Sequence, residues 1–569
     1  MRNFRAIILV VAALVVTTAV PGESEDIIIE ALTDELERSM NELQLEDAPK
    51  PYFIGYTVFD NTQYTESFFV GTSVRDDAIR ARTLRVEVRV GSYELDNRNY
   101  QPRANRSSAI TQGLPFTDDY EELRRAVWRA TDVAYKNAIQ NFASKNTALE
   151  NRRQEDSLSD FSVEKPFRYT SKPEVDFDSI DLRMVRDPAN ELSKLFQNAP
   201  EIYTSVVVAT GAKRRRLFMN SEGSFHDIYE QLCRIRTMAF TQADDGTELQ
   251  DYTTEYSTDC IDFPPVSEMK SRVQHMIDRL QSLRLASPPE EVYNGPVMFE
   301  GQAASEIFRR LLLPRLLAIR VPMTDNPRSD SLRPRNPFLD KIGARVISAK
   351  IDVVNDPTVA TFEDRPLLGH YAVDRQGVPA QRTHLIDGGR LQTLLSTRSP
   401  VDDFKSSTGS SRSGGSAIPG NVFLIPQEGE GLTDEAMQSE MEFLMQDYGV
   451  EYGIVVRRLA NQSELAFGNR TSNVLEAYKV FPDGREELLP VIEITGYNDR
   501  TLRDIVAVSK DVGRYDTVYG YSGGAWVTPI SIVCPSILIE ELTVRKMRPI
   551  SPKPPVVPHP YAEPEALSN

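Results

Sequence analysis

The sequence predicts an α+β fold with mainly antiparallel sheets and flanking helices. Residues 83–90 alternate polar and apolar side chains with a period of two, which is typical of a half-buried strand. Turn sequences at residues 220–223 and 244–246 separate strand-like runs in the manner of consecutive hairpins. Amphipathic helical runs stand before and after these strands. At 569 residues the chain is too long for one ordinary core, so at least two domains are expected.

The first part of the chain mixes helices and strands. Residues 27–45 are predicted to form a helix in which acidic residues stand between apolar ones. Strands are expected next at residues 52–59, 67–73 and 83–90, and a loop is expected at residues 96–116. A long helix begins near Asp118, with Glu121 completing a capping box. Its apolar positions recur at helical spacing from Leu123 to Phe142 and predict a core face.

Antiparallel hairpins are expected over residues 214–258, followed by an amphipathic helix at 266–283 and a boundary at Pro288 and Pro289. Beyond it, one helix at residues 301–313 precedes repeated strands and turns. The end of the chain is rich in proline and predicted to be disordered. The predicted divisions are a signal peptide at 1–19, an N-terminal and central α+β region at 26–290, a C-terminal domain at 291–547 and a proline-rich tail at 548–569.

The N-terminus has the pattern of an export signal. Arg2 and Arg5 precede an apolar stretch at residues 6–16, and Thr17 and Ala19 supply the small side chains of a cleavage site. An uncleaved anchor is the alternative, but the run is shorter than the roughly 20 apolar residues that span a bilayer. No later stretch is apolar enough to span one. We therefore expect an exported protein, periplasmic or extracellular, with no membrane contact beyond the leader.

The formal net charge of −18 argues against general binding to nucleic acid, because the phosphates would be repelled. One basic run, at residues 213–216, interrupts this acidic character. We interpret it as a solvated strand edge and not as a binding patch.

Three cysteines cannot form a disulfide framework. Cys233 and Cys260 are the favoured pair in an oxidising compartment, and Cys534 is left as a small buried hydrophobe. The five histidines are His226, His275, His370, His384 and His559. None lies three to five residues from another, so no helix presents a neighbouring pair to zinc. We interpret each as a structural or surface residue.

Two glycine-rich segments are candidates for catalytic or phosphate-binding motifs. Residues 520–524 match G-x-S-x-G, but a proline-interrupted strand follows where a nucleophile elbow needs a helix, so we interpret the match as chance. Residues 409–416 are rich in glycine and serine without a following helix. They are expected to form a flexible loop that carries Arg412.

A set of segments in the C-terminal half carries the most specific signal. They are Asn-Gly-Pro-Val-Met-Phe-Glu-Gly from Asn294, Asn-Pro-Phe-Leu-Asp-Lys-Ile-Gly from Asn336, Gln-Gly-Val-Pro-Ala-Gln-Arg-Thr from Gln376, Ile-Asp-Gly-Gly-Arg-Leu from Ile386 and Pro-Gly-Asn from Pro419. In these residues and their order the chain resembles the TldD/PmbA family of bacterial metallopeptidases, once described as modulators of DNA gyrase. The N-terminal half is a weaker match, clearest at residues 220–224. The resemblance implies the two-part architecture of that family.

In the active branch of the family, a helix carries H-E-x-x-x-H and a cysteine near the C-terminus completes the zinc site, where the glutamate activates water. Aligned by the Gly-Pro-Val segment, the first histidine falls on Arg309, the glutamate on Arg310 and the second histidine on Pro314. The cysteine falls close to Tyr521. Because guanidinium groups stay protonated and offer no lone pair, we predict no metal ligands and no catalytic residues.

The resemblance is therefore closer to the branch without the metal motif, the PmbA (TldE) type, which pairs with a TldD-type subunit around a cavity for unfolded peptide. The preferred hypothesis is a metal-free subunit that binds extended peptide along a sheet edge, or that completes a dimer with a TldD-like subunit. The alternatives are an active metallopeptidase with non-standard ligands and a structural envelope protein that neither binds nor cuts peptides.

Five arginines are candidates for contacting peptide carboxylates: Arg309, Arg310, Arg382, Arg390 and Arg412. For the first two, the competing interpretation is that they suit the negative C-terminal end of a helix that Pro314 terminates. For the other three, it is that they are ordinary surface residues.

Overall fold

The computed structural model describes residues 26–101, 109–150, 152, 158–171, 177–243, 246–286, 292–461, 474–498, 500–519 and 527–547. The predicted leader, the proline-rich tail, the boundary at Pro288 and Pro289, the G-x-S-x-G segment and Tyr521 lie outside these residues. None of the described helices is both long and apolar enough to cross a membrane.

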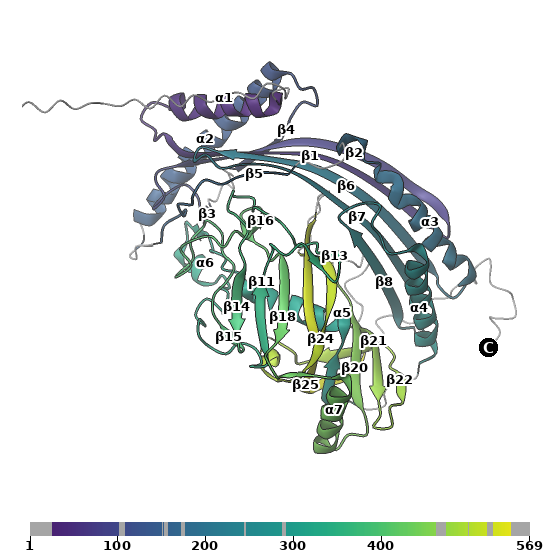
Figure 1. Cartoon of the computed structure of the whole chain (residues 1–569). Helices are drawn as coiled ribbons and strands as arrows, with labels where there is room; N and C mark the ends of the chain where they lie inside the picture. Colours follow the sequence, from purple (N-terminus) through teal and green to yellow (C-terminus); the bar gives the residue numbers. More distant parts are fainter. Residues whose placement is uncertain are drawn as a thin grey trace, which may run out of the picture.

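A seven-stranded sheet arches over the rest of the molecule (Figure 1). Its strands are β1 (Pro51–Phe69), β2 (Thr72–Val90), β4 (Ala109–Gly113), β5 (Arg168–Ser171), β6 (Thr204–Asn220), β7 (Phe225–Gln242) and β8 (Glu248–Ser257). Their order is β4-β2-β1-β6-β7, and both β5 and β8 pair with the outer edge of β7. The hairpins expected over residues 214–258 are thus confirmed.

Helices cover the convex face of this sheet (Figure 1). They are α1 (Ile27–Glu42), α2 (Tyr120–Glu150), α3 (Arg186–Ser193) and α4 (Val266–Leu285). The alternation of side chains along β2 explains why helices cover this face. Its apolar residues Leu84, Val86 and Val88 all point to the convex side, where they are buried together with α1 and α2. Their neighbours Arg85 and Glu87 point the other way and line cavities on the concave face.

Two expectations for the first strands are wrong. Residues 67–73 do not form a strand of their own, because they contain the turn between β1 and β2, where Val70 and Gly71 take φ angles of 49° and 83°. The expected loop at 96–116 contains β4, which pairs with β2 and extends the sheet.

The start of α2 also differs from the expectation. Asp119, and not Asp118, caps the helix, since its Oδ1 accepts a hydrogen bond from the Glu122 N–H at 2.9 Å. Asp118 instead pairs with Arg82, at 2.6 Å between Oδ1 and Nη1.

The basic run at residues 213–216 is not a solvated strand edge. It lies in β6, which pairs with β1 on one side and β7 on the other, and Lys213, Arg214 and Arg216 are all less than 10% exposed. Alternation along the strand divides the run between the two faces. Arg215 pairs with Asp26 at the start of α1 on the convex side, whereas Arg214 and Arg216 line a cavity on the concave side.

A twelve-stranded sheet forms the core of the C-terminal half, beneath the arch (Figure 1). Its strands are β9 (Tyr293–Phe299), β11 (Ile351–Asn355), β14 (Thr383–Asp387), β15 (Arg390–Leu391), β18 (Asn421–Pro426), β19 (Gly431–Leu432), β20 (Gly453–Leu459), β21 (Val474–Val480), β22 (Glu486–Leu488), β23 (Ile492–Thr495), β24 (Ile505–Tyr519) and β25 (Thr528–Lys546). Two-stranded pairs join β3 (Tyr100–Gln101) to β10 (Met323–Thr324), β12 (Thr361–Phe362) to β13 (Arg365–Pro366), and β16 (Ser411–Ser413) to β17 (Ser416–Ala417); a short helix, α6 (Pro327–Ser331), follows β10. Antiparallel pairings predominate in both large sheets, so the predicted fold class is confirmed.

Helices α5 (Gly301–Leu311) and α7 (Asp434–Tyr448) pack on opposite faces of this sheet. In β9, Val297 and Phe299 belong to the core that includes α5, whereas Met298 between them belongs to the core that includes α7. Helix α5 was predicted from the sequence, whereas α7 was not.

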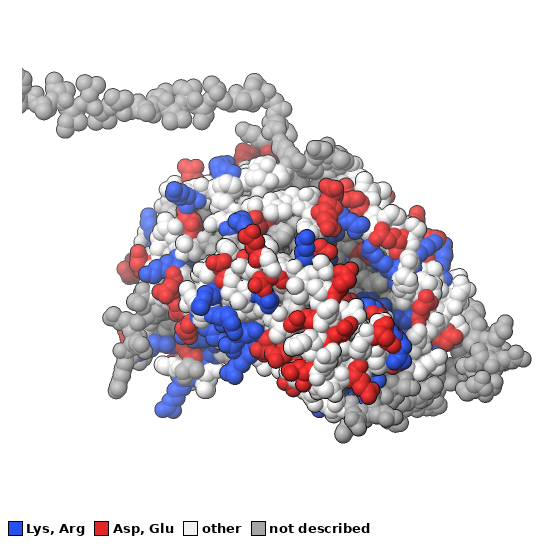
Figure 2. Space-filling view, turned by 60° about the horizontal axis from the view of Figure 1, so that its bottom comes forward, with Lys and Arg blue, Asp and Glu red and all other residues white. Residues whose placement is uncertain are grey.

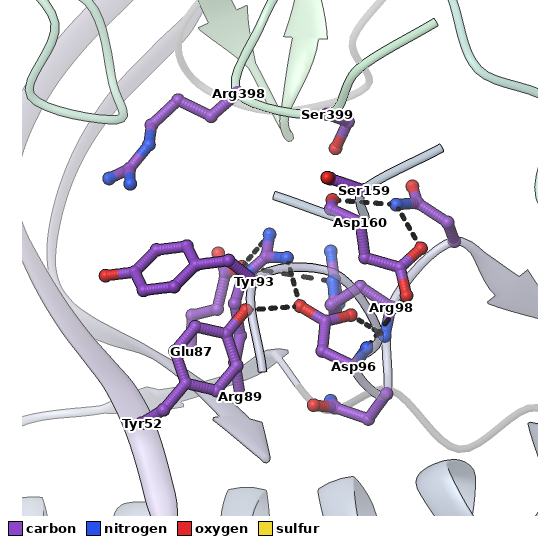
Figure 3. A network of polar contacts seen from close by, with 12 residues as sticks. Tyr52, Glu87, Arg89, Tyr93, Asp96, Arg98, Ser159, Asp160, Arg398 and Ser399 are labelled. Carbon is purple, nitrogen blue, oxygen red and sulfur yellow. Dashed lines mark hydrogen bonds and ion pairs between the residues drawn. The ribbon is translucent and has the colours of Figure 1, made fainter. Parts of the chain in front are cut away.

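A buried network of charges joins the two halves. Arg89 of β2 is 2% exposed and pairs with Glu87 and Asp96, and Asp96 also accepts a hydrogen bond from the Tyr52 hydroxyl at 2.7 Å (Figure 3). Arg398 enters the same region from the C-terminal half (Figure 3). The side chain of Arg398 is 1% exposed and pairs with Glu222 through both terminal nitrogens, at 2.6 and 2.7 Å.

An aromatic ring lies between the two buried arginines. The guanidinium carbons of Arg89 and Arg398 lie 3.6 and 3.8 Å from the centre of the Phe161 ring. Arg398 also donates to the backbone oxygen of Ser162 at 2.6 Å. These contacts fix the concave face of the arch against the C-terminal half.

Candidate functional site

Helix α5 carries the positions onto which the family metal motif aligned. Arg309 and Arg310 lie in its last turn, and the α-helix ends at Leu311, before Pro314. Both arginines pair with Glu306 on the same helix, at 2.8 Å from Arg309 Nε to Oε1 and 3.3 Å from Arg310 Nε to Oε2. Glu306 is fully buried and accepts a further hydrogen bond from the Tyr515 hydroxyl at 3.0 Å. This carboxylate is therefore occupied by internal partners.

A second polar contact ties α5 to the sheet. The thiol of Cys534 on β25 lies 3.1 Å from the Ser305 hydroxyl, and both residues are buried. Burial raises the pKa of Cys534 to about 12, so the group is a neutral thiol at ordinary pH. Cys534 thus behaves as the small buried residue that was expected.

The donor set around α5 does not fit the zinc of the active relatives. Two guanidinium groups occupy aligned positions. Burial lowers the pKa of Arg309, but the charge and the hydrogen bond of Glu306, with smaller contributions from Tyr515 and Tyr252, together outweigh burial and raise the pKa, so the residue stays protonated. Among the described residues, the one group of side chains that could hold a cation is Asp352, His384 and Asp387, on β11 and β14. Asp352 there already accepts hydrogen bonds from Gly388 N and Gln427 Nε2.

The five predicted arginines are not brought together. Arg309 and Arg310 hold Glu306, as described above. The side chain of Arg382 is 65% exposed and lies 3.5 Å from Asp356, and the exposed Arg390 donates to the backbone oxygen of Gly343 at 3.1 Å. Arg412 is different, because it lines a cavity.

This cavity, of about 250 Å³, lies between β6 and β7 of the arch and loops of the C-terminal half. Four arginines line it: Arg214, Arg216, Arg375 and Arg412. The first two come from the arch and the last two from the C-terminal half. Three of the four, Arg214, Arg216 and Arg375, were not predicted as site residues. The period of two in β6 could have separated Arg214 and Arg216 from their neighbours, but nothing local indicates which face a distant segment covers.

The loop expected at residues 409–416 is a short hairpin. β16 and β17 are joined by Gly414 and Gly415, whose φ angles of 56° and 91° suit the tight turn. Arg412 on this hairpin donates to the backbone oxygen of Pro419 at 2.5 Å, and its guanidinium lies 4.8 Å from the centre of the Tyr371 ring. The hairpin therefore holds Arg412 in place.

Two further cavities follow the first along the concave face. The second, of about 80 Å³, shares Arg375 with the first, and the third, of about 360 Å³, shares Arg85 and Glu87 with the second. Gly414 and Gly415 of the hairpin line both the second and the third. The three spaces form a row beneath the arch.

Among the described strands, none covers the outer edge of β7 beside the first cavity; this stretch is called the open edge of β7. Strand β5 pairs with residues 225–228 and β8 with residues 233–242, so no described strand pairs with the stretch from Tyr229 to Leu232 on this edge. The Tyr229 N–H faces this edge, where it donates to the Ser171 hydroxyl at 3.3 Å. Because backbone groups alternate along a strand, the N–H and C=O of Gln231 face the same edge. Residues 229–232 also line the cavity.

The exterior differs from this cavity. On the face that Figure 2 shows, acidic and basic side chains are interspersed over most of the surface, with basic ones gathered on one side. The four arginines of the cavity are thus a local concentration of positive charge in a chain of net charge −18.

Residues 293–546 match the sequence model of a family described as the PmbA/TldA metallopeptidase C-terminal domain. No curated protein sequence matches the chain significantly.

Solved structures share the fold over nearly the whole chain. TldE from Thermococcus kodakarensis is 15% identical with a TM-score of 0.60, over 91% of this chain and 100% of that one. A protein of Thermotoga maritima described as a modulator of a DNA gyrase is 14% identical with a TM-score of 0.60, over 91% and 99%. A protein of Bacteroides thetaiotaomicron with a similar description is 11% identical with a TM-score of 0.57, over 91% and 99%.

Proposed function

We propose that this chain, whose residues 293–546 form a C-terminal domain of the PmbA/TldD family, is a metal-free member that binds extended peptide or pairs with an active TldD-like peptidase. The observation that carries the proposal is the composition of α5. Arg309 stands where a metal-binding relative has its first histidine and Arg310 where it has its glutamate, and both arginines hold the buried Glu306. With no ion to lower the pKa of a bound water, this helix offers no means of activating one.

The row of cavities supports peptide as the ligand. An extended chain is long and narrow, and the three spaces follow one another along the concave face of the arch. Main-chain hydrogen bonds at the open edge of β7 would hold such a chain with little preference for its sequence.

The test combines metal analysis with peptide cleavage. We expect the purified protein to contain no stoichiometric zinc, to leave an unfolded peptide intact with and without chelator, and to bind that peptide saturably. Zinc together with chelator-sensitive cleavage would establish the alternative of an active metallopeptidase with non-standard ligands. Absence of both cleavage and saturable binding would instead favour a structural envelope protein.

Pairing with a TldD-like subunit has its own test. Purification from the native host should recover a relative with an intact H-E-x-x-x-H motif, and the mixture should cleave peptide when the isolated chain does not. A chain recovered alone, whose addition changes nothing in the cleavage by such a relative, would contradict pairing.

Export is the remaining part of the proposal. The disulfide between Cys233 and Cys260 supports it, because such bonds persist in oxidising compartments. Mass spectrometry of the protein from its host should find a chain that begins after Ala19, in the exported fraction. A full-length chain in the cytoplasm with reduced cysteines would contradict export.

A further inference from the structure

The first cavity contains more positive than negative charge. Its lining includes four arginines but only two carboxylates among the described residues, those of Glu230 and Asp374. Glu230 is occupied, because it pairs with Arg214 and lies 3.8 Å from Arg216. Burial raises the pKa of Glu230, but the two arginines outweigh it and lower the value to about 2. The glutamate is therefore ionised and balances the two arginines of β6 only in part.

Asp374 is occupied by backbone groups. Its carboxylate accepts hydrogen bonds from the N–H groups of Gln376, Val378 and Ser411, at 2.8 to 3.0 Å. These bonds shape the loop that carries Arg375 and fasten the hairpin that carries Arg412. Asp374 therefore serves to position the two remaining arginines.

Arg375 and Arg412 have no carboxylate within ion-pair distance among the described residues. Their contacts are with aromatic rings and a backbone oxygen: Arg375 lies over Phe59, and Arg412 lies over Tyr371 and donates to Pro419. Burial, and repulsion from the arginines of β6, lower the pKa of Arg375 to about 9. Burial also lowers the pKa of Arg412, to about 10. Two partly desolvated cations that line one cavity favour the binding of an anion there.

The open edge of β7 adjoins these cations. A peptide that bonds to the main chain of Gln231 lies against the cavity, since residues 229–232 line it. Guanidinium groups bind carboxylates through paired, charge-assisted hydrogen bonds. The cavity is large enough for such a group but enclosed on one side by the arch.

We propose that this cavity is a subsite for a carboxylate group of a bound peptide, recognised by Arg375 and Arg412. The inference rests on the proposed peptide binding and adds a chemical preference to it. A terminal carboxylate and an acidic side chain share this chemistry, and the experiment separates them.

The probes are three fluorescent, unstructured peptides of the same length. The first has a free C-terminus and no acidic residue, the second an amidated C-terminus and one aspartate, and the third an amidated C-terminus and no acidic residue. Their affinities for the full chain are measured by fluorescence anisotropy at constant ionic strength. Tighter binding of the first or the second peptide than of the third, by about tenfold, supports the subsite and identifies which carboxylate occupies it.

Substitutions of the two arginines test whether the preference for a carboxylate arises in this cavity. Arg375→Gln and Arg412→Gln should each lower the affinity for the preferred peptide about tenfold and leave that for the third peptide unchanged. Arg485→Gln is the matched control, because its side chain is 57% exposed on a hairpin outside the cavity, and it should change neither affinity. Thermal unfolding of each variant confirms that the fold is retained.

The outcomes distinguish the two proposals. Equal affinities for all three peptides, or an acid preference that survives both cavity substitutions, would overturn the carboxylate subsite while leaving peptide binding in place. Failure of all three to bind saturably would overturn peptide binding itself, and the subsite with it.

Discussion

Arg375 is a half-buried cation without a carboxylate in ion-pair distance among the described residues, and such a cation lowers the stability of the folded state. Arg375 lines one cavity together with Arg214, Arg216 and Arg412. Burial of its guanidinium, and repulsion from these arginines, lower its pKa to about 9. A group whose charged form is disfavoured in the folded state destabilises that state wherever the group remains charged. Function and stability therefore make opposite demands on this residue.

Replacing Arg375 by glutamine should raise the free energy of unfolding at neutral pH by about 1 kcal/mol. Because the folded pKa lies below the ordinary arginine value, the penalty is present in full below about pH 9 and fades as the pH rises above it. Urea unfolding of both proteins at pH 7 and pH 10 checks this, with the advantage of the variant smaller at pH 10. A variant less stable than the parent at pH 7 would show that Arg375 has a stabilising partner.

Glu306 differs from Arg375 because it is a buried anion that neutralises two neighbouring cations, Arg309 and Arg310. Glu306→Gln leaves Arg309 and Arg310 without their carboxylate and should destabilise the protein by about 3 kcal/mol. Glu37→Gln, on the exposed side of α1, is the control and should change stability by less than about 0.5 kcal/mol. Chemical denaturation measures both. Equal effects would mean that the α5 cluster contributes nothing to stability.

Single positions differed in how well the sequence predicted them. Arg412 was recognised because glycine and serine surround it, and the Cys233–Cys260 pair because few pairings were possible. Arg214 and Arg375 were missed because their significance depends on a contact between segments far apart in the chain, which no local pattern records. The role of Glu306 was not predicted for the same reason, because its hydrogen bond from Tyr515 joins segments far apart in the chain.

At the scale of elements, the disulfide joins β7 to the segment that precedes α4. Cys233 and Cys260 are separated by 27 residues in the sequence, and the bond closes a loop that contains β8. Replacing both cysteines by alanine should lower the free energy of unfolding by about 3 kcal/mol, through the gain in entropy of the unfolded chain. Denaturation with and without a reductant tests this: reduction should destabilise the parent and leave the variant unchanged. A parent insensitive to a reductant that demonstrably opens the bond would contradict it.

Element types were easier to predict than element lengths. The helices at 27–45, 266–283 and 301–313 and the central hairpins are present within a few residues of the expected bounds. β1 and β2 were divided wrongly because 19-residue strands exceed the usual length of about 5–6 residues and their exposed parts lose the apolar pattern.

Helix α7 was missed although its ends are marked in the sequence. Thr433 caps its first turn, and Gly449 ends it with a φ of 65°. Its buried face consists largely of methionines, namely Met437, Met441 and Met445, with Leu444. The two caps and the four-residue spacing of the methionines are the sequence features that predict this helix.

At the scale of the whole molecule, Arg398 connects the halves. Arg398→Ala removes the bidentate pair with Glu222 and the stack on Phe161, and should destabilise the protein by about 3 kcal/mol. Calorimetry should then show a lower unfolding temperature than in the parent, because the halves lose one of their buried polar connections. Arg545→Ala is the control, since its partner Glu493 is exposed and the pair contributes little. A single unshifted transition in the Arg398 variant would show that other contacts suffice.

The two-part organisation was predicted from the chain length and from the resemblance. The arrangement of the two parts in space was not predicted. Nothing in the sequence indicates that the first sheet is curved, or that the second half lies against its hollow side. That arrangement turns alternate residues of β2 and β6 from surface positions into the walls of a row of cavities.

The helices that cover the outer side of the arch all precede residue 286, so this part of the chain carries its own apolar covering. Its inner side presents ionic groups such as Arg85, Glu87, Arg214 and Glu230, which water can solvate. The arch can therefore form its own apolar cores before the remaining half packs against it.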